Sequence, residues 1–325
     1  MPYANENQSR YENRLAKLNQ VAPLSYTFGV EIEFTTRGRL NSSTIELKLK
    51  NKWTELFYDI PRPDFESQSY NHRNSRTIWK IVPDATCGYE LVTPILRGLE
   101  GLETLKRVLQ CMTKLQEEEI ISVNSNCGIH VHLGTRNLSI DDIKKFVSNY
   151  IRRESAIDLL MPLSRRGNRN TWCHSNMGRT GFGSPRNNNE HFESVSYTMS
   201  HVKNFNAPNK RSLSRMFDTR YVKVNTNSMS NHGTIEIRHH SGSLNPTKIT
   251  NWILILDYIL RMSRTQQAFK NPTSNRYVES KGNFREFIRW FDCAPELQTY
   301  MKERKQELQR AESRQRRNSR RRRSS

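Results

Sequence analysis

The chain has 325 residues, and its 52 Lys and Arg against 32 Asp and Glu give a formal net charge of +20. Aliphatic, aromatic and cysteine residues make up 34% of it, which stays below the roughly 45–50% of an average globular domain even when glycine is added. Part of this deficit is local, because residues 301–325 hold eleven basic against three acidic side chains and the first 20 residues are also polar. The rest holds all five tryptophans and is long enough to bury one large core or two modest ones, which excludes wholesale disorder.

Neither a membrane span nor a secretory signal is visible. No stretch approaches the 18 or more apolar residues of a spanning helix, and the first ten residues, MPYANENQSR, lack an apolar core. The five cysteines are an odd number without a CxxC pair, which argues against a disulfide framework and an all-cysteine zinc site. We therefore expect no membrane partner and a reducing, intracellular compartment: the cytoplasm or, in a eukaryotic host, the nucleus.

The sequence divides into a polar lead at 1–22, a domain at 23–300 and a basic tail at 301–325. Alternation of apolar and polar residues predicts strands at 26–35, 77–82, 89–93, 128–134, 221–227 and 234–240. Apolar residues three or four apart predict a helix at 99–119. Further helices are expected at 44–57, 139–160, 247–262, 283–291 and from 295 onward. Ser139 is the expected N-cap of the third helix. Strands interleaved with helices indicate an α+β fold.

Two long segments lack apolar periodicity. Residues 61–76 are expected to form a turn-rich loop, and residues 164–191 are rich in Arg, Asn and Gly. A loop as long as the second is usually either functional or disordered. Its five arginines would suit an acidic substrate that it closes over, but a solvated loop explains them equally well.

Four of the predicted strands carry acids and histidines on one face. The first places Glu31 and Glu33 on the same side, and the strand at 128–134 does the same with His130 and His132. The strand at 89–93 adds Glu90. The last strand is predicted to align Glu236, Arg238 and His240. Each of these faces taken alone has an ordinary explanation as the solvent side of a sheet.

Together the faces indicate a divalent-metal site. Glu31 and Glu33 repel one another unless a cation lies between them. Carboxylates with one imidazole suit Mg²⁺ or Mn²⁺, whereas zinc prefers more histidine or cysteine ligands.

Arg238 follows Glu236 on the last strand. Either it forms a simple ion pair with an acid, or its guanidinium holds a metal-bridged phosphate or a negatively charged transition state, with Arg220 as a second clamp. Acids, histidines and two arginines on one sheet fit nucleotide-dependent phosphoryl chemistry. No GxxxxGK[ST] run is present, so a P-loop is not the means of holding phosphate.

Five motifs follow one another along the chain. They are E-x-E (Glu31, Glu33), D-x(5)-E-L-V-T-P (Asp84, Glu90, Pro94), N-C-G-x-H-V-H (Asn126 to His132), R-Y-x-x-x-N (Arg220 to Asn225) and T-x-E-x-R-x-H-x-G (Thr234 to Gly242). In this order they resemble the amidoligase family, carboxylate–amine ligases with a glutamine-synthetase-like catalytic fold. The resemblance runs from about residue 26 to about residue 262 and leaves both ends of the chain unexplained.

The resemblance implies an antiparallel sheet curved around two or more Mg²⁺ or Mn²⁺ ions and ATP, with helices packed on one side. It further implies an ATP-dependent ligase that phosphorylates a carboxylate to an acyl phosphate, which an amine then attacks to form an amide. The metal ligands that it implies are Glu31, Glu33, Glu90, His130 and Glu236.

The resemblance also implies roles around the phosphates and the amine. His132 is expected near the nucleotide phosphates and Arg238 on the transferred phosphate, and Arg220 and Asn225 are candidates for further nucleotide contacts. Asp84 either positions the incoming amine or caps a turn. The identities of the carboxylate and the amine stay open: a peptide, a polyamine, an amino acid and a protein side chain all fit.

Two other functions compete with the ligase. Acids, histidine and arginine also build the sites of metal-dependent hydrolases and nucleases, and the chain is basic. The third alternative is a polyanion-binding protein on an inactive ligase-like core. Residues 314–325 hold seven arginines and no acid, so we expect a disordered tail that is a solubilising end, a nuclear localisation signal or an attachment to nucleic acid or another polyanion.

Overall fold

A computed structural model describes residues 12, 15–16, 18–19, 21–69, 75–177, 194–265 and 279–323 of the protein. Most of the predicted lead at 1–22 and the second half of the arginine-rich loop lie outside the described residues.

A mixed sheet forms the centre of this described part, with its strands in the order β2-β3-β4-β1-β7-β9-β8. The strands are β1 (Thr27–Thr36), β2 (Asp64–Ser67), β3 (Ile78–Asp84), β4 (Gly88–Val92), β5 (Leu96–Arg97), β6 (Ile121–Ser122), β7 (Gly128–Gly134), β8 (Val224–Asn225) and β9 (Thr234–Ser241). The short strands β5 and β6 pair with the two ends of β1. Strands β2 and β3 are parallel, and the other pairs are antiparallel.

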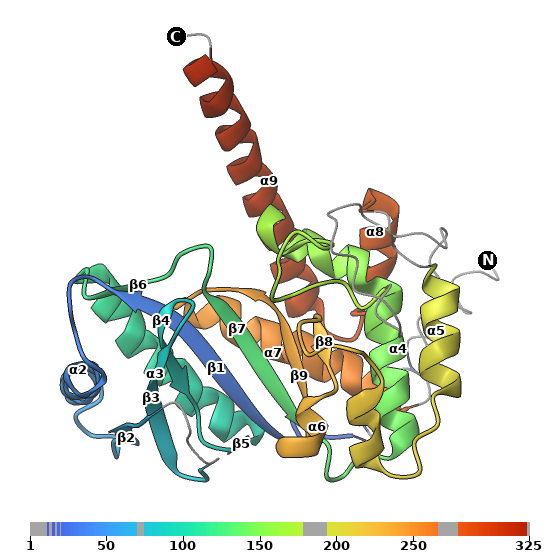
Figure 1. Ribbon diagram of the computed structural model, residues 1–325, viewed down its shortest axis with the longest axis horizontal. Coiled ribbons are helices and arrows are strands. Elements are labelled where there is room, and N and C mark those ends of the chain that lie inside the picture. The colour runs from blue at the N-terminus through green and yellow to red at the C-terminus, as the bar shows by residue number, and fades with distance from the viewer. Residues whose placement is uncertain are drawn as a thin grey trace.

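Helices cover one face of the sheet, and α3 and α7 lie directly behind its central strands (Figure 1). The α-helices are α2 (Ser42–Leu56), α3 (Gly98–Glu117), α4 (Ile140–Ile157), α5 (Val195–Asn204), α6 (Ser228–Asn231), α7 (Pro246–Arg264), α8 (Lys281–Arg289) and α9 (Pro295–Arg323). Short 3₁₀ helices are η1 (Asp158–Leu160), η2 (Leu163–Arg165) and η3 (Lys210–Arg215).

The alternation of side chains in β1 separates the core from the open face of the sheet. Val30 and Ile32 are buried on the helix-covered side, where Leu105 and Leu109 of α3 are also buried. Burying an aliphatic side chain of this size contributes roughly 1.5–3 kcal/mol. The residues of β1 that alternate with these buried ones face the other side of the sheet, which carries the polar groups described below: Gly29, Glu31 and Glu33.

The α+β fold predicted from the sequence is confirmed, as are the five helices predicted between residues 44 and 291. The predicted N-cap of α4 is also present, since Ser139 Oγ accepts a hydrogen bond from the Asp142 amide at 3.0 Å. The strand predicted at 221–227 is wrong over most of its length, because only Val224–Asn225 pairs with β9. Strand β2 lies inside the segment 61–76 that was expected to be a loop.

A β-bulge in β9 overturns one prediction about the face of the sheet. His132 pairs with Glu236, but two residues earlier in β7 the register shifts, and Ile129 pairs with His240. The extra residue of β9 reverses the alternation of its side chains. His240 therefore lies on the helix-covered side, with its ring centroid 5.7 Å from that of Trp252 in α7. The expectation that His240 shares a face with Glu236 is wrong.

Helix α9 continues from Pro295 through Arg323, into the basic segment for which the sequence predicts disorder, and projects from the body of the protein (Figure 1). Its first turns are fixed by the burial of Met301 and Leu308. Extending an existing helix is far easier than starting one, and Gln, Glu and Arg are good helix formers. The missing apolar residues thus prevent the tail from burying a core without preventing it from forming a helix.

Two expectations from composition can be compared with the structure. The five cysteines all lie in the described part of the chain, and no disulfide joins any of them there. Of the helices that the structure describes, none combines the length and the apolar character needed to cross a membrane.

Candidate active site

A cavity of about 850 Å³ opens on the face of the sheet that carries the acidic residues, and this volume is typical of a ligand-binding pocket. All ten site residues predicted from the sequence line it: Glu31, Glu33, Asp84, Glu90, His130, His132, Arg220, Asn225, Glu236 and Arg238. Side chains as distant in the sequence as Glu31 and Arg238 thus share one site.

The register of the strands brings these groups together. Three pairs oppose one another directly across antiparallel strands: Glu31 with His130, Glu33 with Glu90, and His132 with Glu236. Directly opposed residues place their side chains on the same face, with Cβ atoms about 4.5–5.5 Å apart. The polar face predicted strand by strand is therefore continuous from β4 across β1 and β7 to β9.

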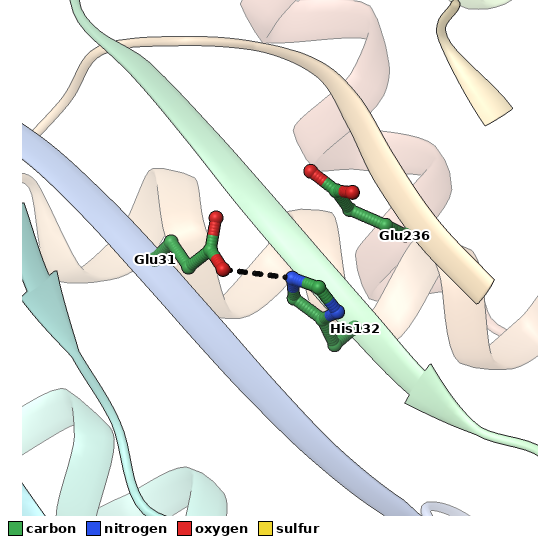
Figure 2. Close-up of side chains that lie close together, drawn as sticks. All are labelled: Glu31, His132 and Glu236. Carbon is green, nitrogen blue, oxygen red and sulfur yellow. Dashed lines mark hydrogen bonds and ion pairs between the residues drawn. The ribbon is translucent and has the colours of Figure 1, made fainter. Parts of the chain in front are cut away.

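Glu31, His132 and Glu236 form a group of side chains in the described part of the chain that could hold a metal ion (Figure 2). One ligand atom from each lies within 4.8 Å of the others. His132 Nε2 is 3.0 Å from Glu31 Oε1, and Thr234 Oγ1 lies 2.9 Å from His132 Nδ1, which orients the ring. Two carboxylates and one imidazole are a suitable donor set for Mg²⁺ or Mn²⁺.

His130 lies among three carboxylates. Its Nδ1 is 2.9 Å from Glu31 Oε2 and 3.6 Å from Glu236 Oε1, and its Nε2 is 3.4 Å from Glu33 Oε1. Both histidines therefore adjoin Glu31. The division of roles predicted for them, His130 on metal and His132 near phosphate, stays a prediction.

The electrostatics of the site favour a bound cation. Burial and the charges of Glu31 and Glu33 raise the pKa of the Glu90 carboxyl well above its usual value. Burial acts in the same direction on Glu31, but the charge of His132 and the hydrogen bonds from both histidines outweigh it and hold the pKa of Glu31 well below its usual value. The site thus accommodates its acids by driving Glu90 toward the neutral form, and a cation would relieve the same repulsion.

Arg238 is held on two sides. Its Nη1 donates a hydrogen bond to the carboxylate of Glu236, and its Nε donates to the main-chain oxygen of Trp172 at 3.2 Å. Asn225 Nδ2 donates to the second oxygen of Glu236 at 2.6 Å. The two readings of Arg238 are therefore compatible, because the guanidinium is ion-paired and still lines the cavity.

Asp84 and Arg220 line the cavity but are engaged in local contacts. Asp84 Oδ1 accepts hydrogen bonds from the amides of Thr86 at 2.8 Å and Cys87 at 2.9 Å, so it does cap the turn between β3 and β4. Arg220 Nη2 lies 3.2 Å from the hydroxyl of Tyr221, and its guanidinium stacks on the Tyr221 ring. The amine-positioning role of Asp84 and the phosphate role of Arg220 stay predictions.

Gly128 allows two site residues to approach the start of β7. Its amide donates a hydrogen bond to Glu33 Oε2 at 2.6 Å. A Cβ at this position would lie 3.2 Å from His130 Nε2 and 3.3 Å from Arg165 Nη1. Arg165, from the first part of the arginine-rich loop, is itself buried and donates to the Cys127 carbonyl at 2.6 Å. This part of the loop is therefore built into the cavity wall.

Lys80 and His232 also line the cavity, and sequence reasoning missed both. Lys80 interrupts the apolar run IWKIV, and this signal would have marked it as a buried lysine. Burial lowers its pKa. His232 precedes β9, and its ring centroid lies 5.9 Å from that of His132. No periodic pattern includes it.

Residues 24–260 match the family described as "putative amidoligase enzyme". The chain belongs to this amidoligase family. The family that the five motifs indicated is thereby confirmed over nearly the range expected from them. No protein with curated information matches the sequence of this amidoligase.

Several solved structures are similar to the amidoligase at low sequence identity. A novel glutamine synthase homolog has a TM-score of 0.45 and 10% identity, with 92% of this chain and 70% of that one covered. The complex between the prokaryotic ubiquitin-like protein Pup and its ligase PafA has a TM-score of 0.34 and 11% identity, with 89% of this chain and 64% of that one covered. A bifunctional glutathione synthetase from Pasteurella multocida has a TM-score of 0.37 and 14% identity, with 92% of this chain and 49% of that one covered. The amidoligase chain thus spans only about half of the last protein.

Proposed function

We propose that this amidoligase is an ATP-dependent ligase that joins a carboxylate to an amine through an acyl phosphate. The observation that carries the proposal is the placement of Arg238 beside a group of metal-ligand side chains within one cavity of about 850 Å³. A cavity of this size has room for a nucleotide and a second substrate. The family membership supports a ligase in general, and the site chemistry supports the ATP-dependent mechanism.

The residues of the cavity fit a divalent cation. Glu31, His132 and Glu236 would hold one Mg²⁺ or Mn²⁺ ion, which gives His132 a metal-ligand role in place of the phosphate role predicted from the sequence. Glu33, Glu90 and His130 are the ligands proposed for a second ion. The raised pKa of Glu90 supports this fit, since it reflects burial together with the charges of the neighbouring acids, which a bound cation would offset. When bound, such ions would neutralise the charge of the nucleotide phosphates.

Arg238 is proposed to hold the phosphoryl group during transfer. Its planar guanidinium offers several N–H donors, and Glu236 together with the Trp172 carbonyl fixes the plane before substrate arrives. A donor fixed in advance stabilises charge that develops in the transition state without reorganisation. A carboxylate oxygen of the substrate would form the bond to the γ-phosphorus as the bond to ADP breaks.

The second step joins the amine. The nitrogen attacks the acyl carbon, the phosphate leaves, and the amine loses a proton. Asp84 is the carboxylate proposed to hold the amine, because it lines the cavity from the β3–β4 turn and only its Oδ1 is used to cap that turn.

Trapping with hydroxylamine tests the acyl phosphate. Purified protein is incubated with Mg²⁺, ATP, hydroxylamine and a panel of small carboxylates, and ADP and hydroxamate are measured. We expect both products with the wild type and with Glu103→Gln, which changes an exposed acid on α3, and neither with Glu236→Gln. Turnover of a phosphodiester without ATP would instead show a metal-dependent hydrolase, the competing function.

The substrates can be identified in cells. Mass spectrometry of metabolites and proteins compares cells that express the wild type with cells that express Glu236→Ala. A new amide linkage, formed with loss of water and present only with the wild type, would identify the carboxylate and the amine.

A further inference from the structure

Helix α9 has a face made of polar and basic side chains. Gln306, Gln309, Arg310, Ser313, Arg314 and Arg317 line one open surface along it. These positions repeat at intervals of three and four residues, which places them on one side of an α-helix. From Gln309 to Ser319 every side chain is exposed except Glu312, so the arginines on this face are accessible.

The other side of α9 fixes the helix to the protein. Met301 and Leu308 are buried against the body. Glu312 Oε1 lies 2.7 Å from Nη2 of Arg166, which is itself buried. On a helical projection Met301, Leu308 and Glu312 lie on one side of α9. Arg310, Arg314 and Arg317 lie roughly on the opposite side. The arginine face therefore points to solvent, and Figure 1 shows the end of α9 extending well beyond the rest of the chain.

The charge on this projecting end has one sign. Glu312 is the last acidic residue of the sequence, and Arg166 neutralises it. Seven arginines and no acid follow between 313 and 323. With a rise of about 1.5 Å per residue, the segment from Arg310 to Arg323 extends for about 20 Å. A helix of this length that carries mainly positive charge attracts a polyanion of regular geometry.

We propose that the arginine face of α9 binds double-stranded DNA. An α-helix has a diameter of about 10–12 Å with its side chains, and the major groove of B-form DNA is about 12 Å wide. Arg310, Arg314 and Arg317 are then placed to contact backbone phosphates, which bind arginine without regard to base sequence. This binding does not depend on the ligase activity proposed above.

Two other polyanionic surfaces fit the helix less well. Helices that lie on anionic membranes need an apolar face opposite or beside the basic one, and the exposed residues from 309 to 319 include no large apolar side chain. The major groove of an RNA duplex is deep and narrow, so a helix with its side chains does not enter it. The shape of α9 therefore favours DNA.

Fluorescence anisotropy with a labelled DNA duplex of about 20 base pairs tests the proposal, at salt concentrations from about 50 to about 200 mM. The test variant of the full chain is R310Q/R314Q/R317Q, since glutamine keeps helix propensity and removes charge. The matched control is R39Q/R62Q/R285Q, which removes three exposed arginines elsewhere on the protein. Circular dichroism and melting temperature verify that both variants fold.

The two variants are expected to behave differently. Each phosphate contact makes the slope of log affinity against log salt concentration steeper by about 0.9. Removing three contacts should therefore make the slope shallower by about 3 and weaken binding at least about tenfold. The control should match the wild type. Equal losses in both variants, or no binding of the duplex by the wild type at low salt, would overturn the proposal. Tighter binding of an RNA duplex or of phosphatidylserine vesicles than of DNA would overturn it as well.

Discussion

Lys223 Nζ lies 2.7 Å from Asp158 Oδ1, and both side chains are completely buried. The same nitrogen is 3.0 Å from Glu154 Oε1. This ion pair connects the loop that follows α4 to the strand that carries the site: Asp158 Oδ2 accepts the Gly167 amide at 2.8 Å, and the Lys223 carbonyl accepts the Arg238 amide at 2.9 Å. The buried charges of Lys223, Asp158 and Glu154, which lie outside the cavity, therefore help to position Arg238.

Replacing Lys223 by methionine is expected to destabilise the protein by about 3–5 kcal/mol, because two buried carboxylates lose their cation. Urea unfolding measures the change. The control is Lys248→Met, which removes a partly exposed lysine 3.0 Å from the exposed Glu307 and should cost less than about 1 kcal/mol. Similar losses in the two variants would contradict this account of the buried pair.

The buried ring of His240 predicts a loss of stability in acid. Burial lowers the pKa of His240 to about 3, despite a hydrogen bond to the Ser241 carbonyl, whereas the unfolded chain has a value near 6.5. The unfolded state therefore binds a proton more readily, so the stabilisation is complete above about pH 6.5 and is lost as the pH falls toward 3. Each pH unit in this window costs up to about 1.4 kcal/mol per group.

Comparing the wild type with His240→Phe checks this expectation, because phenylalanine keeps a ring beside Trp252 and does not titrate. Unfolding free energies are measured between about pH 7 and pH 4. The variant should show a shallower decline. His239, whose pKa burial lowers to about 4, still titrates in both proteins and contributes to the remaining slope, as does Glu31, whose pKa is held below its usual value. Parallel curves would show that His240 is not buried in its neutral form.

The sequence predicted the polar face because each strand obeys the two-residue alternation locally. The same rule failed at the β9 bulge, where one extra residue turned His240 to the other side of the sheet. Bulges depend on the register of a partner strand, so a single strand contains no signal for them. Lys223 was missed for a related reason: in the segment YVKVN a lysine between valines reads as a solvent-facing residue, and only the partners from α4 and η1 bury it.

Glu90 provides a test of cation binding. Glu90→Gln should change the stability of the metal-free protein little, because burial and the neighbouring acids already drive this carboxyl toward its neutral form. Mg²⁺ at about 100 times its dissociation constant should stabilise the wild type by about 2.7 kcal/mol, and the variant by much less at the same concentration. Thermal unfolding with and without Mg²⁺ measures both values. The exposed control Glu103→Gln should gain as much stability from Mg²⁺ as the wild type. If Glu90→Gln gains as much as these two proteins, Glu90 is not a ligand.

The last prediction concerns the geometry of Arg238. Arg238→Lys keeps the positive charge, but one ammonium group cannot reproduce donors to both Glu236 and the Trp172 carbonyl while presenting a planar fork to the cavity. In the proposed mechanism kcat should fall about 10²–10³-fold, as for the loss of one fixed donor to a transition state, with little change in the dissociation constant of ATP. Arg39→Lys, at an exposed arginine that does not line the cavity, is the matched control and should retain the wild-type kcat. Steady-state kinetics and direct ATP titration separate the two quantities. Equal kcat in Arg238→Lys and the wild type would remove Arg238 from phosphoryl transfer, while a parallel loss of ATP affinity would assign it to ground-state binding.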